Sequence, residues 1–209
     1  MTIYTMIGSK NTPYEPCEVL RAFAYKMASL NHKGRSGGAI GSDEQLEKGV
    51  FDYIADQAKN NINICPSSLM EIYLPRPYFN GKSKAPGYIV PDFDCPLYKK
   101  AGEIASTVHP KWSKCNLAAR QYHSRNVYQV KGLTLDILSE FVICWAPPVS
   151  PGSDMVQGGT ATAVKLAIMN KIPVINIWYK DQMQLVKRWL NDSTGLCLLS
   201  AWESLWDYY

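Results

Sequence analysis

Phe141-Val142-Ile143-Cys144-Trp145-Ala146 is an uninterrupted apolar run, and a loop rich in proline and glycine follows it. The run has the length of a β-strand and lacks the alternation of a half-exposed one, which indicates a strand covered on both faces. Beyond the loop, Gly158-Gly159-Thr160-Ala161-Thr162-Ala163 leads into a predicted helix that ends near Asn170, and Pro173–Ile177 supplies another strand. A strand, a glycine turn, a helix and a second strand in this order are typical of a parallel sheet.

The same order of elements occurs twice in the N-terminal half. Ile3–Ile7 reads as a strand that ends at Gly8, and the apolar residues after Pro13 recur at helical spacing. A short strand around Arg35-Ser36 then leads through a glycine turn into a second amphipathic helix. Capping boxes are expected where these two helices begin. They would pair Thr12 with Glu15 and Ser42 with Gln45.

The other predicted elements are a strand at 69–74 and helices at 97–108, 116–128 and 182–190. Residues 75–96 are rich in proline and have no sustained period, which indicates a loop-rich insertion that could act as a lid. We therefore predict one α/β domain over residues 1–209. Its Rossmann-like, mostly parallel sheet would have helices on both faces.

Composition narrows the class of protein. The net charge of +4 is small and no lysine- or arginine-rich run occurs, so nucleic-acid binding is not favoured. The N-terminus lacks the pattern of a signal peptide, and the apolar runs are too short to span a membrane, so we expect a cytoplasmic protein. The cysteines form no CxxC pair, so we expect reduced thiols. They are Cys17, Cys65, Cys95, Cys115, Cys144 and Cys197.

A metal site is not expected from the spacing of possible ligands. His109, Cys115 and His123 come nearest to a ligand set, but their spacing matches no common zinc pattern. The three residues are therefore predicted to be unrelated surface or packed side chains. We therefore predict neither a bound metal nor a cofactor.

Three turns rich in small residues are the candidates for ligand binding: Gly8-Ser9, Ser36-Gly37-Gly38 and Gly158-Gly159-Thr160. In a parallel sheet all three follow the carboxyl ends of strands and lie at one edge. Glycine lets the backbone approach a phosphate, and the helix that follows offers free amides and a positive dipole. Each turn alone could be a simple tight turn, but together they indicate one phosphate site. No Walker A or complete GxGxxG sequence is present, which argues against a hydride-transferring dehydrogenase.

Polar side chains near these turns are further candidates. Asp43 and Glu47 lie one helical turn apart and could bind ribose hydroxyls or activate water, although Asp43 could simply complement the helix dipole. Arg125 suits bidentate phosphate binding but could form a surface salt bridge. The other predicted ligand-binding residues are Arg35, which could instead flank the sheet, together with Asn126 and Thr162. Trp145 could stack on a base or pack against the insertion.

Four ordered segments resemble the SLOG superfamily, which includes the Smf/DprA DNA-processing proteins and the LOG nucleotide hydrolases. They are Ile7-Gly8-Ser9-x-x-Thr12-Pro13, Arg35-Ser36-Gly37-Gly38-Ala39-x-Gly41-x-Asp43, Arg125-Asn126-Val127-Tyr128-Gln129-Val130-x-Gly132 and Gly158-Gly159-Thr160-Ala161-Thr162-Ala163. The resemblance covers residues 3–45 and 116–177 and is greatest to small stand-alone SLOG proteins of bacteriophages.

The resemblance implies a site and also shows a departure from the family. It implies that Arg125 faces the ligand and that the chain forms a homo-oligomer, a dimer in many members. LOG hydrolases carry a Pro-Gly-Gly-x-Gly-Thr-x-x-Glu motif whose glutamate acts on the N-glycosidic bond. Here Ala161 replaces a glycine and Lys165 stands at the position of the glutamate. Because lysine cannot stabilise a developing oxocarbenium charge, hydrolysis would require Asp43 or Glu47 to take over.

Three functions follow as hypotheses. The first is a protein that binds a nucleoside phosphate or ADP-ribose-like ligand, with hydrolysis of its N-glycosidic bond left open. The second is a non-catalytic protein that sequesters or senses a nucleotide, which a phage could use in the host cytoplasm against defence signalling. The third is DprA-like binding of single-stranded DNA, which the small net charge disfavours.

Overall fold

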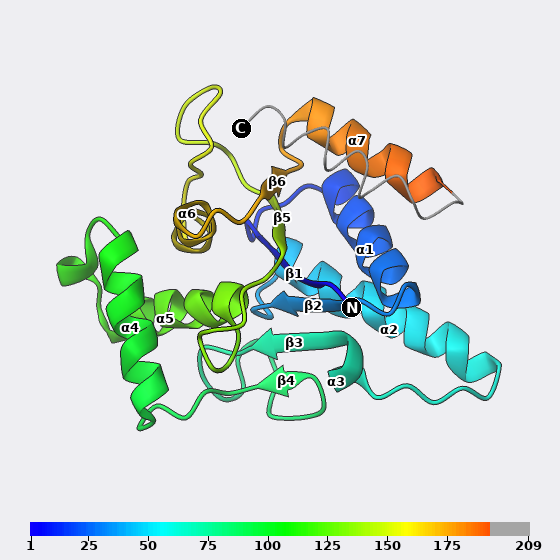
Figure 1. The fold of residues 1–209 in the computed structure, drawn as a ribbon, viewed down its shortest axis with the longest axis horizontal. Coiled ribbons are helices and arrows are strands. Elements are labelled where there is room, and N and C mark those ends of the chain that lie inside the picture. Colours follow the sequence, from blue (N-terminus) through cyan, green and yellow to red (C-terminus); the bar gives the residue numbers. More distant parts are fainter. Residues whose placement is uncertain (193–209) are drawn as a thin grey trace.

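The computed structural model describes residues 1–192, so Cys197 and the last part of the predicted 1–209 domain lie outside the described residues. The described chain folds into a six-stranded, all-parallel sheet with helices on both faces, which confirms the predicted α/β class (Figure 1). The strands are β1 Ile3–Gly8, β2 Lys33–Ser36, β3 Met70–Tyr73, β4 Tyr88–Ile89, β5 Phe141–Trp145 and β6 Val174–Asn176. The helices are α1 Tyr14–Ser29, α2 Ser42–Lys59, α3 Pro66–Leu69, α4 Pro96–Val108, the 3₁₀ turn η1 Trp112–Lys114, α5 Leu117–Lys131, α6 Ala161–Met169 and α7 Lys180–Asn191.

The strand order is β4-β3-β2-β1-β5-β6, so the chain builds outward from β1 and then returns to the other side of it. β1 pairs with β2 through Thr5 opposite Arg35, and with β5 through Ile7 opposite Cys144. The strand order therefore reverses between β1 and β5. In open parallel sheets, ligands bind outside the carboxyl ends of the strands at such a switch point.

Alternating residues of the strands supply the two layers of the core. Tyr4 and Met6 of β1 pack with α1, α2 and α7, whereas Ile7 packs with α4, α5 and α6. Figure 1 shows these two groups of helices on opposite sides of the sheet. The apolar run in β5 divides in the same way, since Ile143 joins the first layer while Val142 and Cys144 join the second. All three side chains are fully buried, which confirms a strand covered on both faces.

The two predicted capping boxes are wrong. Pro13 and Gly41 are the N-caps of α1 and α2, and neither helix has a side-chain cap. The Thr12 hydroxyl donates instead to the Ser9 carbonyl (2.6 Å), and the Gln45 amide donates to the Gly41 carbonyl (2.9 Å). Gly41 has a φ of 84°, a backbone conformation that glycine adopts without cost, so the chain enters α2 one residue before the expected serine cap.

The 75–96 segment is largely irregular, as predicted, but it also contributes an edge strand to the sheet. Tyr88 and Ile89 form β4, which pairs with Ile72 and Tyr73 of β3. A two-residue strand is too short to produce a recognisable sequence period. Within residues 1–192, no helix combines the length and the apolar character needed to cross a membrane.

Candidate functional site

The three glycine turns follow the carboxyl ends of β1, β2 and β5, which lie side by side in the sheet. Residues 8–9 end β1, residues 36–38 end β2, and residues 158–160 lie on the connection from β5 to α6. The Ser9 amide donates to the carbonyl of Trp145 (2.9 Å), which joins the ends of β1 and β5 directly. The turns differ in how much of their backbone is open to a ligand.

The first turn is closed by contacts with the start of α2. The Ser9 carbonyl accepts hydrogen bonds from the amides of Thr12 and Ser42, both at 3.3 Å. A methyl group at Gly8 would lie 2.3 Å from Ser42 Oγ, and one at Gly41 would lie 2.3 Å from the Ser9 carbonyl oxygen. These glycines therefore allow the first turn and the start of α2 to pack against each other.

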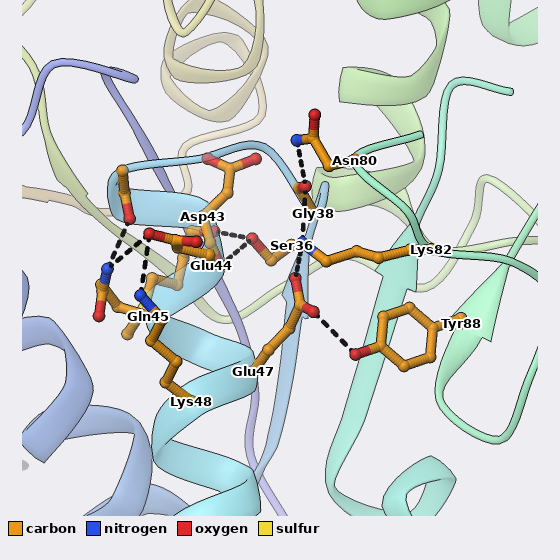
Figure 2. A network of polar contacts seen from close by, with 12 residues as sticks. Ser36, Gly38, Asp43, Glu44, Gln45, Glu47, Lys48, Asn80, Lys82 and Tyr88 are labelled. Carbon is orange, nitrogen blue, oxygen red and sulfur yellow. Dashed lines mark hydrogen bonds and ion pairs between the residues drawn. The ribbon is translucent and has the colours of Figure 1, made fainter. Parts of the chain in front are cut away.

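The second turn is covered by side chains from distant parts of the chain. Ser36 Oγ donates to the Met6 carbonyl (2.7 Å), and a methyl group at Gly37 would lie 1.1 Å from Arg125 Nη1. The Gly38 carbonyl accepts from Asn80 Nδ2 (3.0 Å) and Lys82 Nζ (2.9 Å), as Figure 2 shows. The Arg125 guanidinium thus lies on Gly37, and the 75–96 segment covers Gly38.

Asp43 and Arg125 form a buried ion pair beside these two turns. Arg125 Nη1 lies 3.4 Å from Asp43 Oδ2, and Gln129 Nε2 is at the same distance from that oxygen. The Gly8 amide donates to Asp43 Oδ1 (3.1 Å). Both charged side chains are more than nine-tenths buried, and Arg125 Nε has no hydrogen-bond partner among the described residues. Burial raises the pKa of Asp43 against the opposing effect of Arg125, and it lowers the pKa of Arg125.

Glu47 follows one helical turn after Asp43 but faces a different cation. Lys82 Nζ lies 3.0 Å from Glu47 Oε1, and the Tyr88 hydroxyl donates to Oε2 (2.7 Å). Figure 2 shows Glu47 of α2 pointing towards these two residues of the 75–96 segment. Burial, with the hydrogen bond to Glu47, raises the pKa of Tyr88. Each of the two predicted catalytic carboxylates therefore has a compensating cation. None of these contacts involves a residue of the third turn.

Arg35 lies within the sheet and not at its carboxyl edge. Arg35 Nε donates to Glu71 Oε2 (2.9 Å), and Nη1 donates to the Ile137 carbonyl (2.6 Å). Its guanidinium packs against Gly132, where a methyl group would lie 2.6 Å from Nη2. The structure thus separates Arg35 from the other predicted ligand-binding residues, in agreement with the alternative that it only flanks the sheet.

The third turn is open. Methyl groups at Gly158 and Gly159 would meet no atom of the described chain within 4 Å. The amides of residues 158–160 donate no hydrogen bond to any described residue. Asn126 Nδ2 donates to the Gly159 carbonyl (2.8 Å), so α5 braces the turn from outside. Thr160 is buried and is the N-cap of α6, whose first amides have no intrahelical acceptor.

The first turn of α6 also contacts His123, which the sequence did not place near this turn. Thr162 Oγ1 lies 2.9 Å from Nδ1 of His123, whose pKa is lowered to about 4 by burial and by the nearby charges of His109 and Arg125. One donor atom from each of His109, Cys115 and His123 lies within 4.8 Å of the others. The prediction that these three residues are unrelated is therefore wrong. The turn between α4 and α5 joins them at a spacing that no common motif describes.

Two surface grooves lie away from the third turn. One, of about 610 Å³, is lined by α1, α2 and α7 and includes Arg21 and Asp52. The other, of about 330 Å³, runs along α2 and includes Glu47 and Lys82. The residues of the third turn line neither groove. The candidate site is thus an open edge of the sheet.

Comparison with known proteins adds no relative to these observations. No protein-family model matches the chain, and no curated protein matches it. The SLOG resemblance remains a prediction from four sequence segments. The candidate site rests on its own geometry.

Proposed function

We propose that the protein binds a nucleotide or a similar phosphate-bearing ligand at the carboxyl edge of the sheet. The ligand phosphate would lie on residues 158–160 and the N-terminus of α6. One observation carries this proposal: next to the switch point between β1 and β5, two glycines face open space and the amides of residues 158–160 have no partner in residues 1–192. Backbone amides at a helix N-terminus are a ready anion site.

Arg125 supports the same assignment through charge. The Arg125 guanidinium is buried on Gly37 of the second turn, and the next residue of α5, Asn126, donates to the Gly159 carbonyl of the third turn. Arg125 Nε is unpaired within the described chain, and the contact to Asp43 is long at 3.4 Å. A guanidinium with an unused donor can bind an anionic oxygen at little cost, because no strong hydrogen bond is given up.

The geometry favours binding without hydrolysis. Asp43 accepts from the Gly8 amide and pairs with Arg125, and Glu47 pairs with Lys82. A carboxylate whose charge is already compensated stabilises an oxocarbenium ion poorly. Lys165, in the second turn of α6, supplies no carboxylate either. We therefore place the protein among sequestering or sensing proteins, with a dimer as the state that the resemblance implies.

Calorimetric titration of the whole protein with nucleoside mono-, di- and triphosphates tests the proposal, with nucleosides and inorganic phosphate as reference ligands. Gly159→Asp places a negative charge in open space, and we expect it to weaken nucleotide binding about tenfold or more. Ser150→Asp adds the same charge to an exposed position of the same long loop and should leave binding nearly unchanged.

Three results would contradict the proposal. Equal binding by nucleosides and nucleotides would remove the phosphate from recognition, and equal effects of the two aspartates would move the site elsewhere. Binding of single-stranded oligonucleotides in the absence of any mononucleotide binding would replace the proposal with DNA binding. Chromatography of each mixture shows whether free base is released. If it is released and Asp43→Asn prevents the release, the protein is a hydrolase.

A further inference from the structure

His109, Cys115 and His123 converge where α4, η1 and α5 meet. His109 is the C-cap residue directly after α4, Cys115 follows η1, and His123 lies in the second turn of α5. Cys115 Sγ is 3.7 Å from His109 Nδ1, and the two imidazole rings lie 4.1 Å apart between centroids. All three residues are half-buried, so the donor atoms are sheltered but can be reached from solvent.

We infer that these three side chains bind one transition-metal ion, with Zn²⁺ as the best match. Tetrahedral zinc holds a thiolate at about 2.3 Å and an imidazole nitrogen at about 2.0–2.1 Å, which places sulfur and nitrogen about 3.6 Å apart. The distance between Cys115 Sγ and His109 Nδ1 is 3.7 Å. The full set of donors spans up to 4.8 Å, so an inward shift of about 1 Å by flexible side chains would complete the site.

The surroundings are those of a metal-binding histidine. Thr162 Oγ1 lies 2.9 Å from His123 Nδ1, which leaves His123 Nε2 available for the metal. A hydrogen bond to the second ring nitrogen fixes the orientation and tautomer of a ligating imidazole. The Trp112 ring lies near both imidazoles, at 6.4 Å from His109 and 6.3 Å from His123, and supplies an apolar wall.

The competing contacts are weak. The Lys111 amide donates to His109 Nδ1 at 3.3 Å, and Cys115 Sγ lies 3.5 Å from the Lys111 carbonyl. Both bonds are local to the turn and would be exchanged for much stronger bonds to the ion. Two imidazoles and one thiolate suit zinc and copper better than magnesium or calcium, which prefer oxygen.

The site offers three protein ligands, and the described residues place no fourth histidine, cysteine or carboxylate with them. Water would take the remaining tetrahedral position. The inference does not depend on the proposed nucleotide site, because the three ligands come from α4, the following turn and α5. It concerns α6 only through Thr162.

Titration of the reduced, chelator-treated protein with Co²⁺ tests the site. We expect one Co²⁺ per chain, the visible absorption of a tetrahedral ion, a near-ultraviolet charge-transfer band from the thiolate, and displacement by Zn²⁺. Cys115→Ser should abolish the charge-transfer band and weaken metal binding about a hundredfold, whereas Cys65→Ser, which changes an exposed thiol, should leave both unchanged. Thr162→Val, which removes the partner of His123 and no ligand, should weaken binding about tenfold.

His109→Gln keeps the test decisive if Cys115→Ser fails to fold, as circular dichroism would show. This variant should retain the charge-transfer band and bind metal at least about tenfold more weakly. Absence of metal uptake by the unmodified protein would overturn the inference. Uptake that Cys115→Ser and His109→Gln leave unaltered would also overturn it, because other residues would then hold the ion.

Discussion

Two arginine–carboxylate pairs with buried guanidinium groups distinguish the interior of the sheet from its carboxyl edge. Arg35 lies 2.9 Å from Glu71 and also donates to a backbone carbonyl at 2.6 Å. Arg125 lies 3.4 Å from Asp43 and leaves its Nε without a partner in residues 1–192. The first arginine makes two short hydrogen bonds within the fold. The second is buried to the same degree but incompletely bonded, which is the condition expected of a group that binds something else.

The pKa values of the two carboxylates are shifted in opposite directions. Burial favours a raised pKa at Glu71, but hydrogen bonds and charges from Tyr73, Arg35 and Lys33 prevail, and its pKa is lowered. At Asp43 burial prevails over Arg125, and the pKa is raised. The same pairing of residue types thus favours the charged carboxylate within the sheet, whereas at the edge burial outweighs the effect of the arginine.

The largest effect on stability is expected when the Arg35–Glu71 pair is broken. Arg35→Met removes the cation of the pair and the donor to the Ile137 carbonyl. Glu71 keeps the hydrogen bond from the Tyr73 hydroxyl (2.7 Å). Loss of one partner from a fully buried pair costs about 3–5 kcal/mol. Because the Glu71 side chain is 23% exposed and keeps other partners, we expect a loss of about 3 kcal/mol, the lower end of that range, in the free energy of unfolding. Denaturant titration measures it. Lys33→Met is the control, since Lys33 lies 3.8 Å from Glu71, and it should cost less than about 1 kcal/mol. Similar losses for the two variants would refute the structural role of Arg35.

A smaller loss of stability is expected when Arg125 is displaced from its place beside Asp43. In Gly37→Ala the new methyl group would lie 1.1 Å from Arg125 Nη1, so the guanidinium must leave its place on the turn. We expect a loss of about 2 kcal/mol, in the range of overpacked cores. The loss should fall by more than half in an Arg125→Ala background, because the clashing group is then absent.

Gly102→Ala is the matched control for that experiment. Its methyl group would lie 3.5 Å from Ser124 Oγ, an ordinary contact between α4 and α5, and should change stability by less than about 1 kcal/mol. If Gly37→Ala costs the same with and without Arg125, the guanidinium does not lie on this turn.

The smallest effect is a pH dependence of opposite sign at the two carboxylates. The pKa of Glu71 is lower in the folded state, so its stabilisation is present above the unfolded value of about 4.3 and is lost as the pH falls through the folded value. The stability difference between the unmodified protein and Glu71→Gln should therefore shrink on acidification. The pKa of Asp43 is higher in the folded state, so its stabilisation is present below about pH 3.9 and is lost as the pH rises. The difference from Asp43→Asn should therefore shrink towards neutral pH.

Urea unfolding of the three proteins between about pH 3 and about pH 8 resolves the two slopes. Slopes of the same sign would show that the two pairs have equivalent surroundings. The comparison between the interior and the edge would then fail.

Much of the fold could be predicted because it depends on local patterns. The apolar run of β5 and the glycine turns after β1 and β2 are visible in single windows of sequence. β4 could not be predicted, since two residues carry no period and their pairing with β3 depends on the preceding loop. The capping box at α2 failed because the positive φ of Gly41 shifts the start of the helix, and nothing in the sequence motif reports a dihedral angle. The one at α1 failed because the Thr12 hydroxyl donates to the Ser9 carbonyl instead.

The candidate site was less predictable because its decisive contacts join distant residues. Sequence reasoning favoured Arg125 over Arg35 but could not identify their partners, since the partner of Arg35 lies 36 residues away and that of Arg125 lies 82 residues away. Lys82 and Tyr88, which bind the Glu47 carboxylate, come from a segment without any recognisable motif. The grouping of His109 with His123 likewise depends on the bend between two helices.

The carbonyl of Ser9 has a consequence for how the edge could adapt to ligands. It receives the amides of Thr12 and Ser42 and the Thr12 hydroxyl, so it ties the first two strand–helix connections into one rigid body. Residues 147–160 form a long loop that is joined to α5 by the hydrogen bond from Asn126 to the Gly159 carbonyl and to Tyr179 by the bond from its hydroxyl to the Ser153 carbonyl. Slow hydrogen exchange is expected on the first side of the edge and faster exchange on the second. Residues 147–160 would thus adjust to ligands of different size, while the first two strand–helix connections would keep one conformation.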